Sequence, residues 1–70
     1  MPLAMAPVGE ELKITKVITD EKTKRHLENL GILVGGSIEL ISSSQGDLIV
    51  KVKDGRLALN RQVATRIFVA

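Results

Sequence analysis

Few side chains in this 70-residue sequence could carry out catalysis. It has no cysteine, tryptophan or tyrosine, and His26 is its single histidine. A Ser–His–Asp arrangement would need His26, but no serine stands in a nucleophile-elbow sequence. The consecutive serines 42–44 are typical of a polar loop. Because most of the side chains that active sites usually require are missing, we predict that the chain is not an enzyme.

Metal and phosphate sites have equally little support. Two metal ligands on one helix face stand three or four residues apart. The neighbours of His26 at those spacings are poor ligands, namely Lys22, Thr23, Asn29 and Leu30. No glycine-rich segment leads into a helix with Lys-Ser or Lys-Thr, so the phosphate-binding loop pattern is absent. We predict no catalytic, cofactor-binding or metal-binding residues.

Binding to nucleic acid or to proline-rich peptides usually depends on aromatic side chains, which stack on bases or prolines. Phe68 is the only aromatic residue of the chain. The formal net charge of +2 also lacks the clustered basic stripe of a nucleic-acid binder. We therefore expect no nucleic acid as partner. A small RNA-binding barrel stays open as an alternative, and its signature would be binding that weakens strongly with salt.

Several surface positions are candidates for contact with another protein. Lys24 and Arg25 belong to a basic patch on a predicted helix, although a solvated polar face is the simpler explanation. Leu33 and Val34 lie in a glycine-flanked turn, where they are either core residues or an exposed apolar contact. Phe68 stands between two inward-facing residues, so strand alternation directs it outward. There it could support contact with another chain, including a second copy.

A lead-in and a first strand open the chain. Residues 1–7 carry two prolines and are predicted to be flexible, ahead of a single domain over residues 8–70. β-Branched residues favour a strand from Glu10 to Ile18. The apolar phase shifts between Ile14 and Val17, which predicts a bulge there.

One helix is predicted, from Asp20 to Leu30. Asp20 can cap its N-terminus, and Thr23, Leu27 and Leu30 form a narrow apolar stripe. Gly31 follows where a helix ends in the left-handed conformation, and Ile32 can fold back onto Leu27.

The second half of the chain is predicted to be strands joined by tight turns. Apolar residues alternate around Ile38 and again from Leu48 to Val52. Asp54-Gly55 predicts a type I′ hairpin turn, residues 60–65 fit one helical turn, and residues 66–69 form a last strand. Closing five short strands into a small barrel removes their exposed edges. We predict a mainly β fold: a small barrel of about five strands, with one α-helix after the first strand and a short helical turn before the last.

The chain shows no targeting pattern. Its start has no basic residue ahead of an apolar run, and no segment approaches the roughly 20 apolar residues of a membrane span. We expect a cytoplasmic protein.

Several segments stand out together by their order and spacing: Leu27–Gly35, Gly46-Asp47 through Leu57-Ala58-Leu59, Ala64 and Ile67–Val69. In this order and spacing they resemble the ferrous iron transport protein A family (FeoA). The resemblance extends from about Val8 to Val69. Two prolines usual in the family are replaced by Val34 and Leu48, which should loosen turns without changing the fold.

The resemblance implies an SH3-like barrel and a cytosolic accessory role in bacterial ferrous iron uptake. It implies docking on the cytosolic GTP-binding region of an FeoB-type transporter, through Leu27 and the Leu30–Gly35 turn. Leu27 also lies on the core stripe of the helix, so its loss would destabilise the domain as well. Together with the surface candidates above, the predicted partner-binding residues are Lys24, Arg25, Leu27, Gly31, Leu33, Val34 and Phe68.

A related alternative belongs to another functional class. The same barrel occurs as the C-terminal domain of iron-dependent transcriptional repressors. This chain lacks the helix-turn-helix and the metal residues that such a repressor needs, so under this interpretation it would be a fragment.

Overall fold

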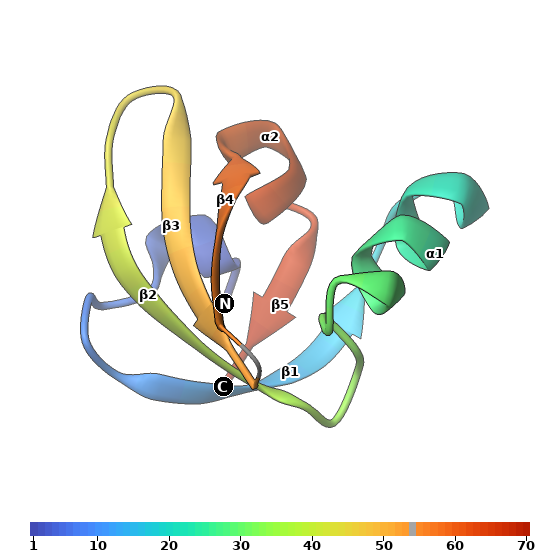
Figure 1. Ribbon diagram of the computed structural model, residues 1–70, viewed down its shortest axis with the longest axis horizontal. Helices are drawn as coiled ribbons and strands as arrows, with labels where there is room; N and C mark the ends of the chain where they lie inside the picture. The colour runs from blue at the N-terminus through green and yellow to red at the C-terminus, as the bar shows by residue number, and fades with distance from the viewer. Residues whose placement is uncertain (54) are drawn as a thin grey trace.

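The computed structural model describes residues 1–53 and 55–70, and its five strands form one antiparallel sheet in the order β4-β3-β2-β1-β5 (Figure 1). The predicted mainly β fold with five strands and two short helices is confirmed. The strands are β1 (Glu11–Val17), β2 (Ser37–Ser43), β3 (Asp47–Val52), β4 (Gly55–Asn60) and β5 (Ile67–Val69).

β1 belongs to both halves of the sheet. Its first three residues pair with β2, from Glu11 opposite Glu39 to Lys13 opposite Ser37. The rest of β1 pairs with β5, and the register shifts between Ile14 and Lys16. This irregularity is the predicted bulge, and it turns β1 from one partner strand to the other.

The helix α1 (Glu21–Asn29) begins and ends as its sequence predicts. The Asp20 carboxylate accepts a hydrogen bond from the Thr23 N–H at 3.0 Å. At the other end Gly31 has φ +95°, and the Ile32 N–H donates to the Leu27 carbonyl at 2.9 Å. These bonds make a Schellman cap, in which Ile32 and Leu27 are both buried. The predicted apolar stripe is wrong at its last member, because Leu30 is exposed.

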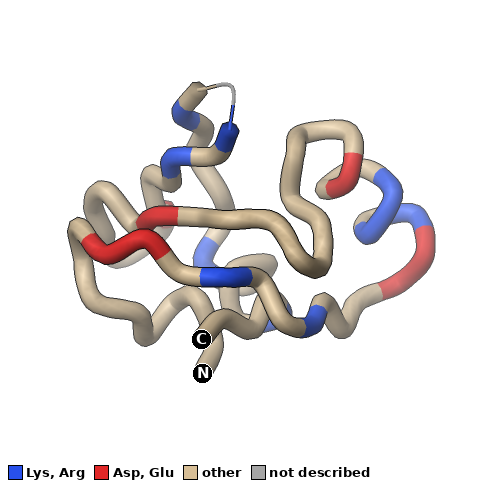
Figure 2. Tube along the Cα trace, turned by 90° about the horizontal axis from the view of Figure 1, so that it is seen from below, with Lys and Arg blue, Asp and Glu red and all other residues tan. Residues whose placement is uncertain are grey.

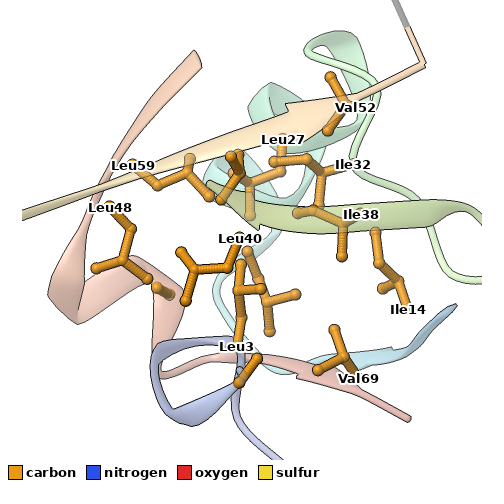
Figure 3. Packing of buried hydrophobic residues seen from close by; sticks show 14 residues of the cluster. Leu3, Ile14, Leu27, Ile32, Ile38, Leu40, Leu48, Val52, Leu59 and Val69 are labelled. Carbon is orange, nitrogen blue, oxygen red and sulfur yellow. The ribbon is translucent and has the colours of Figure 1, made fainter. Parts of the chain in front are cut away.

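One hydrophobic core fills the space inside the sheet (Figure 3). The predicted inward alternation is confirmed in β2, β3 and β5, where every second side chain is buried. The sequence has no cysteine, and no polar or charged residue is buried within residues 1–53 and 55–70, so stability depends on this packing. The buried residues are Leu3, Ala6, Ile14, Leu27, Ile32, Ile38, Leu40, Leu48, Val50, Val52, Leu59, Ala64, Ile67 and Val69.

The N-terminal segment, for which the sequence predicts a flexible lead-in, contributes Leu3 and Ala6 to this core. A 3₁₀ turn, η1 (Leu3–Met5), places Leu3 in the interior with 1% of its surface exposed. The Met1 ammonium donates to the Val69 carbonyl at 2.9 Å, and Pro2 bridges to Phe68. Two prolines suggested a loop, but tertiary contacts with β5 hold the segment in place.

The β3–β4 hairpin is confirmed by six consecutive residue pairs. Its predicted turn falls on Asp54, which lies outside the described residues; Gly55 already pairs with Val52 and begins β4. The short helix α2 (Arg61–Ala64) follows, and the Asn60 side chain accepts from the Gln62 N–H at 2.7 Å. Among the described residues, no helix is both long and apolar enough to cross a membrane.

Candidate interaction site

The turn between α1 and β2 exposes three large apolar side chains. Leu30, Leu33 and Val34 are 38%, 46% and 58% exposed, whereas Ile32 between them is buried. Leu33 and Val34 are therefore not core residues, and their contact with another protein stays a prediction. An exposed cluster of this kind is typical of a surface that contacts another molecule.

Backbone hydrogen bonds hold this turn against β1. The Gly35 N–H donates to the Ile14 carbonyl at 2.8 Å, and the Ile14 N–H donates to Gly36 at 2.8 Å. The Gly36 N–H closes the turn on the Leu33 carbonyl at 2.9 Å. Gly35 has φ +92°, a conformation that L-residues rarely adopt. Leu33 and Val34 are therefore presented by a fixed backbone.

A groove of about 380 Å³ opens beside the turn. At this end of the strands, the outermost residue pair between β2 and β3 is Glu39 opposite Lys51. Apolar residues of the turn and strands form part of its lining, while charged residues of both signs stand around it. The residues lining the groove are Glu11, Gly31, Leu33, Gly36, Ser37, Ile38, Glu39, Lys51, Val52 and Lys53.

The predicted site residues separate into three groups in the structure. Gly31 and Leu33 line the groove, and Val34 is exposed on the same turn. Lys24 is half-buried and Arg25 exposed on α1, where the basic residues lie between acidic residues near the two ends of the helix (Figure 2). Neither residue lines the groove.

The last two predicted contact residues, Leu27 and Phe68, lie apart from the groove lining. Leu27 is only 2% exposed and packs in the core, so it cannot touch a partner in this conformation. Its neighbours in the core include Ile32 and Val52 (Figure 3). Phe68 is half-buried and does not belong to the core cluster, which agrees with its outward direction, but Pro2 bridges to it across β5. Contact of the half-buried Phe68 side chain with another chain stays a prediction.

Sequence reasoning missed the charged residues around the groove. Glu11, Glu39 and Lys51 come from three different strands, and only the pairing register brings them together. Strand alternation does place each of them outward. The groove beside Gly31 has no sequence signal of its own.

Within residues 1–53 and 55–70, no three His, Cys, Asp or Glu side chains gather closely enough to hold an ion. Hydrogen bonds from the side chain and the backbone of Thr23 lower the pKa of Asp20 below its ordinary value. Asp20 serves as a helix cap, which accounts for this shift without a ligand.

Comparison with known proteins decides the family. The FeoA domain model matches residues 1–70. The chain belongs to the FeoA family. A curated FeoA relative, named Fe(2+) transport protein A, comes from Methanocaldococcus jannaschii and is 31% identical over 68 residues, covering 97% of this chain and 83% of the relative.

Solved FeoA structures have the same fold. A crystal structure described as iron uptake regulatory protein FeoA superposes with a TM-score of 0.90 at 23% identity, covering 99% of this chain and 93% of the other. FeoA of Stenotrophomonas maltophilia, complexed with zinc and described as a procaryotic SH3 domain protein, gives 0.78 at 22% identity, covering 100% and 89%. The predicted SH3-like barrel is thereby confirmed.

The same barrel is also found in a longer regulator. A manganese-dependent transcriptional repressor superposes with a TM-score of 0.90 at 16% identity. The match covers 100% of this chain but 40% of the repressor, so the FeoA-like unit corresponds to one part of that protein. At this identity the similarity concerns the fold alone.

Proposed function

We propose that this FeoA protein is a small cytosolic accessory of ferrous iron uptake that acts by binding rather than by catalysis. Its partner would be the cytosolic GTP-binding region of an FeoB-type transporter. The family membership and the Fe(2+) transport name of the curated relative support the process. The observation that carries the binding role is the exposed apolar turn beside a groove.

The turn has the properties of an anchor for a protein partner. Leu33 and Val34 are each about half exposed, so burying what remains would contribute on the order of 1 kcal/mol per side chain. The turn is already fixed by hydrogen bonds to Ile14, so binding would order little additional chain. Charges of both signs around the groove, including Glu11 and Lys53, can orient a partner and exclude wrong ones.

Binding of the Leu33→Asp variant to the purified GTP-binding region tests the proposal. A charge at this position would have to be buried in the complex, so we expect affinity to fall at least about tenfold, which corresponds to roughly 1.4 kcal/mol. Titration calorimetry with and without a non-hydrolysable GTP analogue would measure it. The matched control is Ile18→Asp, because Ile18 is 43% exposed but lies outside the turn and the groove.

Equal loss of affinity in the two variants would contradict the assignment of the surface. Unchanged circular dichroism melts are required of both, so that unfolding does not imitate lost binding. Absence of binding by the unmodified protein in either nucleotide state would contradict the partner. Strongly salt-dependent binding to RNA would then favour the RNA-binding alternative.

A further inference from the structure

Four charged residues form one row across the outer face of the sheet. Glu11 stands opposite Glu39, Glu39 opposite Lys51, and Lys51 opposite Arg56. Their neighbours along each strand point into the core, so all four side chains face outward. The row, which we call the charge row, reads acidic, acidic, basic, basic from β1 to β4. Figure 2 shows acidic segments on β1 and β2 and basic segments around the β3–β4 hairpin.

The two like-charged pairs of this row, Glu11–Glu39 and Lys51–Arg56, are both non-hydrogen-bonded pairs, the type in which the two residues lie closer together. Hydrogen-bonded and non-hydrogen-bonded residue pairs alternate along two antiparallel strands. The Ile14 N–H donates to the Gly36 carbonyl, so the Glu11–Glu39 pair, three positions further along, is a non-hydrogen-bonded pair. On β3 and β4, the bond from the Arg61 N–H to the Gly46 carbonyl places Lys51–Arg56 in the same class. Such pairs have Cα atoms about 4.5 Å apart rather than about 5.5 Å.

Like charges directly opposite each other in a sheet destabilise it. The charge row contains two such pairs, one acidic and one basic, on one solvent-facing surface. A surface with the opposite order of charges would relieve both repulsions at once. This is an independent indication that the face is covered by a partner.

An apolar strip runs beside the charge row. Ile49 pairs with Ala58, and Ile41 is the extra residue at the register shift between Leu40 and Ser42. Ile41 and Ile49 are half-buried, yet neither packs against the core cluster, so both face outward. Ala58 is exposed beside them. The outer face thus combines an apolar strip with an ordered set of charges.

We propose that this face binds a second copy of the same chain. From β1 to β4 the charge row is acidic, acidic, basic, basic, and from β4 to β1 it is basic, basic, acidic, acidic. Two copies of the row that face each other in opposite directions therefore place opposite charges together at every position. A two-fold axis parallel to the strands sets Glu11 against Arg56 of the second copy and Glu39 against its Lys51. The same axis lays one apolar strip on the other. The result is an isologous, aligned sheet-on-sheet dimer.

The dimer and the proposed transporter contact would exclude each other in part. Glu11, Glu39 and Lys51 belong both to the charge row and to the lining of the groove. A second copy on the outer face would therefore cover the groove. The inference itself rests only on the register and charges of this chain, and it holds or fails independently of the transporter.

Complementary single charge reversals test the pairing. In Glu39→Lys and in Lys51→Glu, like charges would meet twice across the axis, so each variant alone should stay monomeric. Mixed in equal amounts, they should associate, because residue 39 of each variant then meets an opposite charge at residue 51 of the other. Sedimentation equilibrium at low salt, up to about 1 mM protein, detects even a millimolar dissociation constant.

The unmodified protein should dimerise under the same conditions, and raised salt should weaken the dimer because exposed charges are screened. Lys16→Glu is the matched control: Lys16 is exposed on β1 opposite Phe68, away from the charge row, and its reversal should leave association unchanged. Circular dichroism checks the fold of each variant. Should either reversal fail to fold, Glu11→Lys and Arg56→Glu form a second complementary pair at the ends of the row.

Three results would overturn the inference. One is an unmodified protein that stays monomeric up to about 1 mM at low salt. Another is a single reversal that dimerises as well as the unmodified protein. The third is a mixture of the two reversals that gains no association over either alone.

Discussion

Asp20 shows how one side chain links helix capping to pH. Its carboxylate accepts from the Thr23 N–H at 3.0 Å, and hydrogen bonding from Thr23 lowers its pKa below the ordinary 3.8. The folded state therefore holds the ionised carboxylate more favourably than the unfolded chain does. This contribution to stability is complete above the unfolded pKa and is lost as pH falls through the lower, folded value.

Asp20→Ala should accordingly destabilise the protein at neutral pH and much less so at pH values well below 3.8. Urea unfolding at both pH values, followed by circular dichroism, measures the difference. Asn60→Ala is the control, since Asn60 caps α2 with an uncharged amide. Its cost of about 1 kcal/mol should stay the same at both pH values. A pH-independent penalty for Asp20→Ala would contradict the role of its ionised form.

Individual residues were predictable where a local rule decides their place. Asp20, Gly31 and Asn60 could be assigned to helix ends because their side chains or backbone conformations suit those positions. Leu27 was assigned both to the core and to a partner contact, and its burial decides for the core. Burial depends on what the rest of the chain places above a residue, and no local rule contains that information.

At the scale of elements, the end of α1 is fixed by a glycine in an unusual conformation. Gly31 has φ +95°, and a Cβ there would meet only Val52 atoms at 3.8 Å or beyond. There is room for a methyl group, so the cost of Gly31→Ala comes from backbone strain rather than from a clash. We expect a loss of about 1–2 kcal/mol in the free energy of unfolding.

Gly46→Ala is the control for this prediction. Gly46 does not have a positive φ, and nothing lies within 4 Å of an added Cβ, so its substitution should change stability little. Denaturant unfolding of the two variants provides the comparison. Equal stabilities would mean that the left-handed conformation at residue 31 contributes nothing.

Most elements follow from periodicity, but their partners do not. Alternation around Ile38, Leu48 and Ile67 predicts strands and their buried faces correctly. The pairing of β1 with both β2 and β5 is a tertiary choice, for which the phase shift near Ile14 was only an indirect sign. The groove and the charge row both depend on this pairing register. For that reason neither could be predicted from the sequence.

At the scale of the whole molecule, the N-terminal segment closes the core. Leu3 and Met5 belong to the same 3₁₀ turn, but Leu3 is 1% exposed and Met5 is 75% exposed. Leu3→Ala should therefore cost about 2–5 kcal/mol, because it removes buried methyl groups and leaves a cavity. Met5→Ala should cost little. Thermal and urea unfolding would compare them.

Similar stabilities of these two variants would mean that residues 1–7 are the flexible lead-in that the prolines suggested. A small domain is sensitive to such a loss, because its total stability is about 5–15 kcal/mol.

The hydrogen bond between the Met1 ammonium and the Val69 carbonyl joins groups 68 positions apart along the chain. The β2–β3–β4 hairpins need only short loops to form, whereas β5 must find β1 and the N-terminal segment across almost the entire sequence. Closing so long a loop costs entropy before any contact offsets it. We therefore expect β5 to complete the native state, because until it docks, the core around Leu3 and Ile14 lacks Ile67 and Val69.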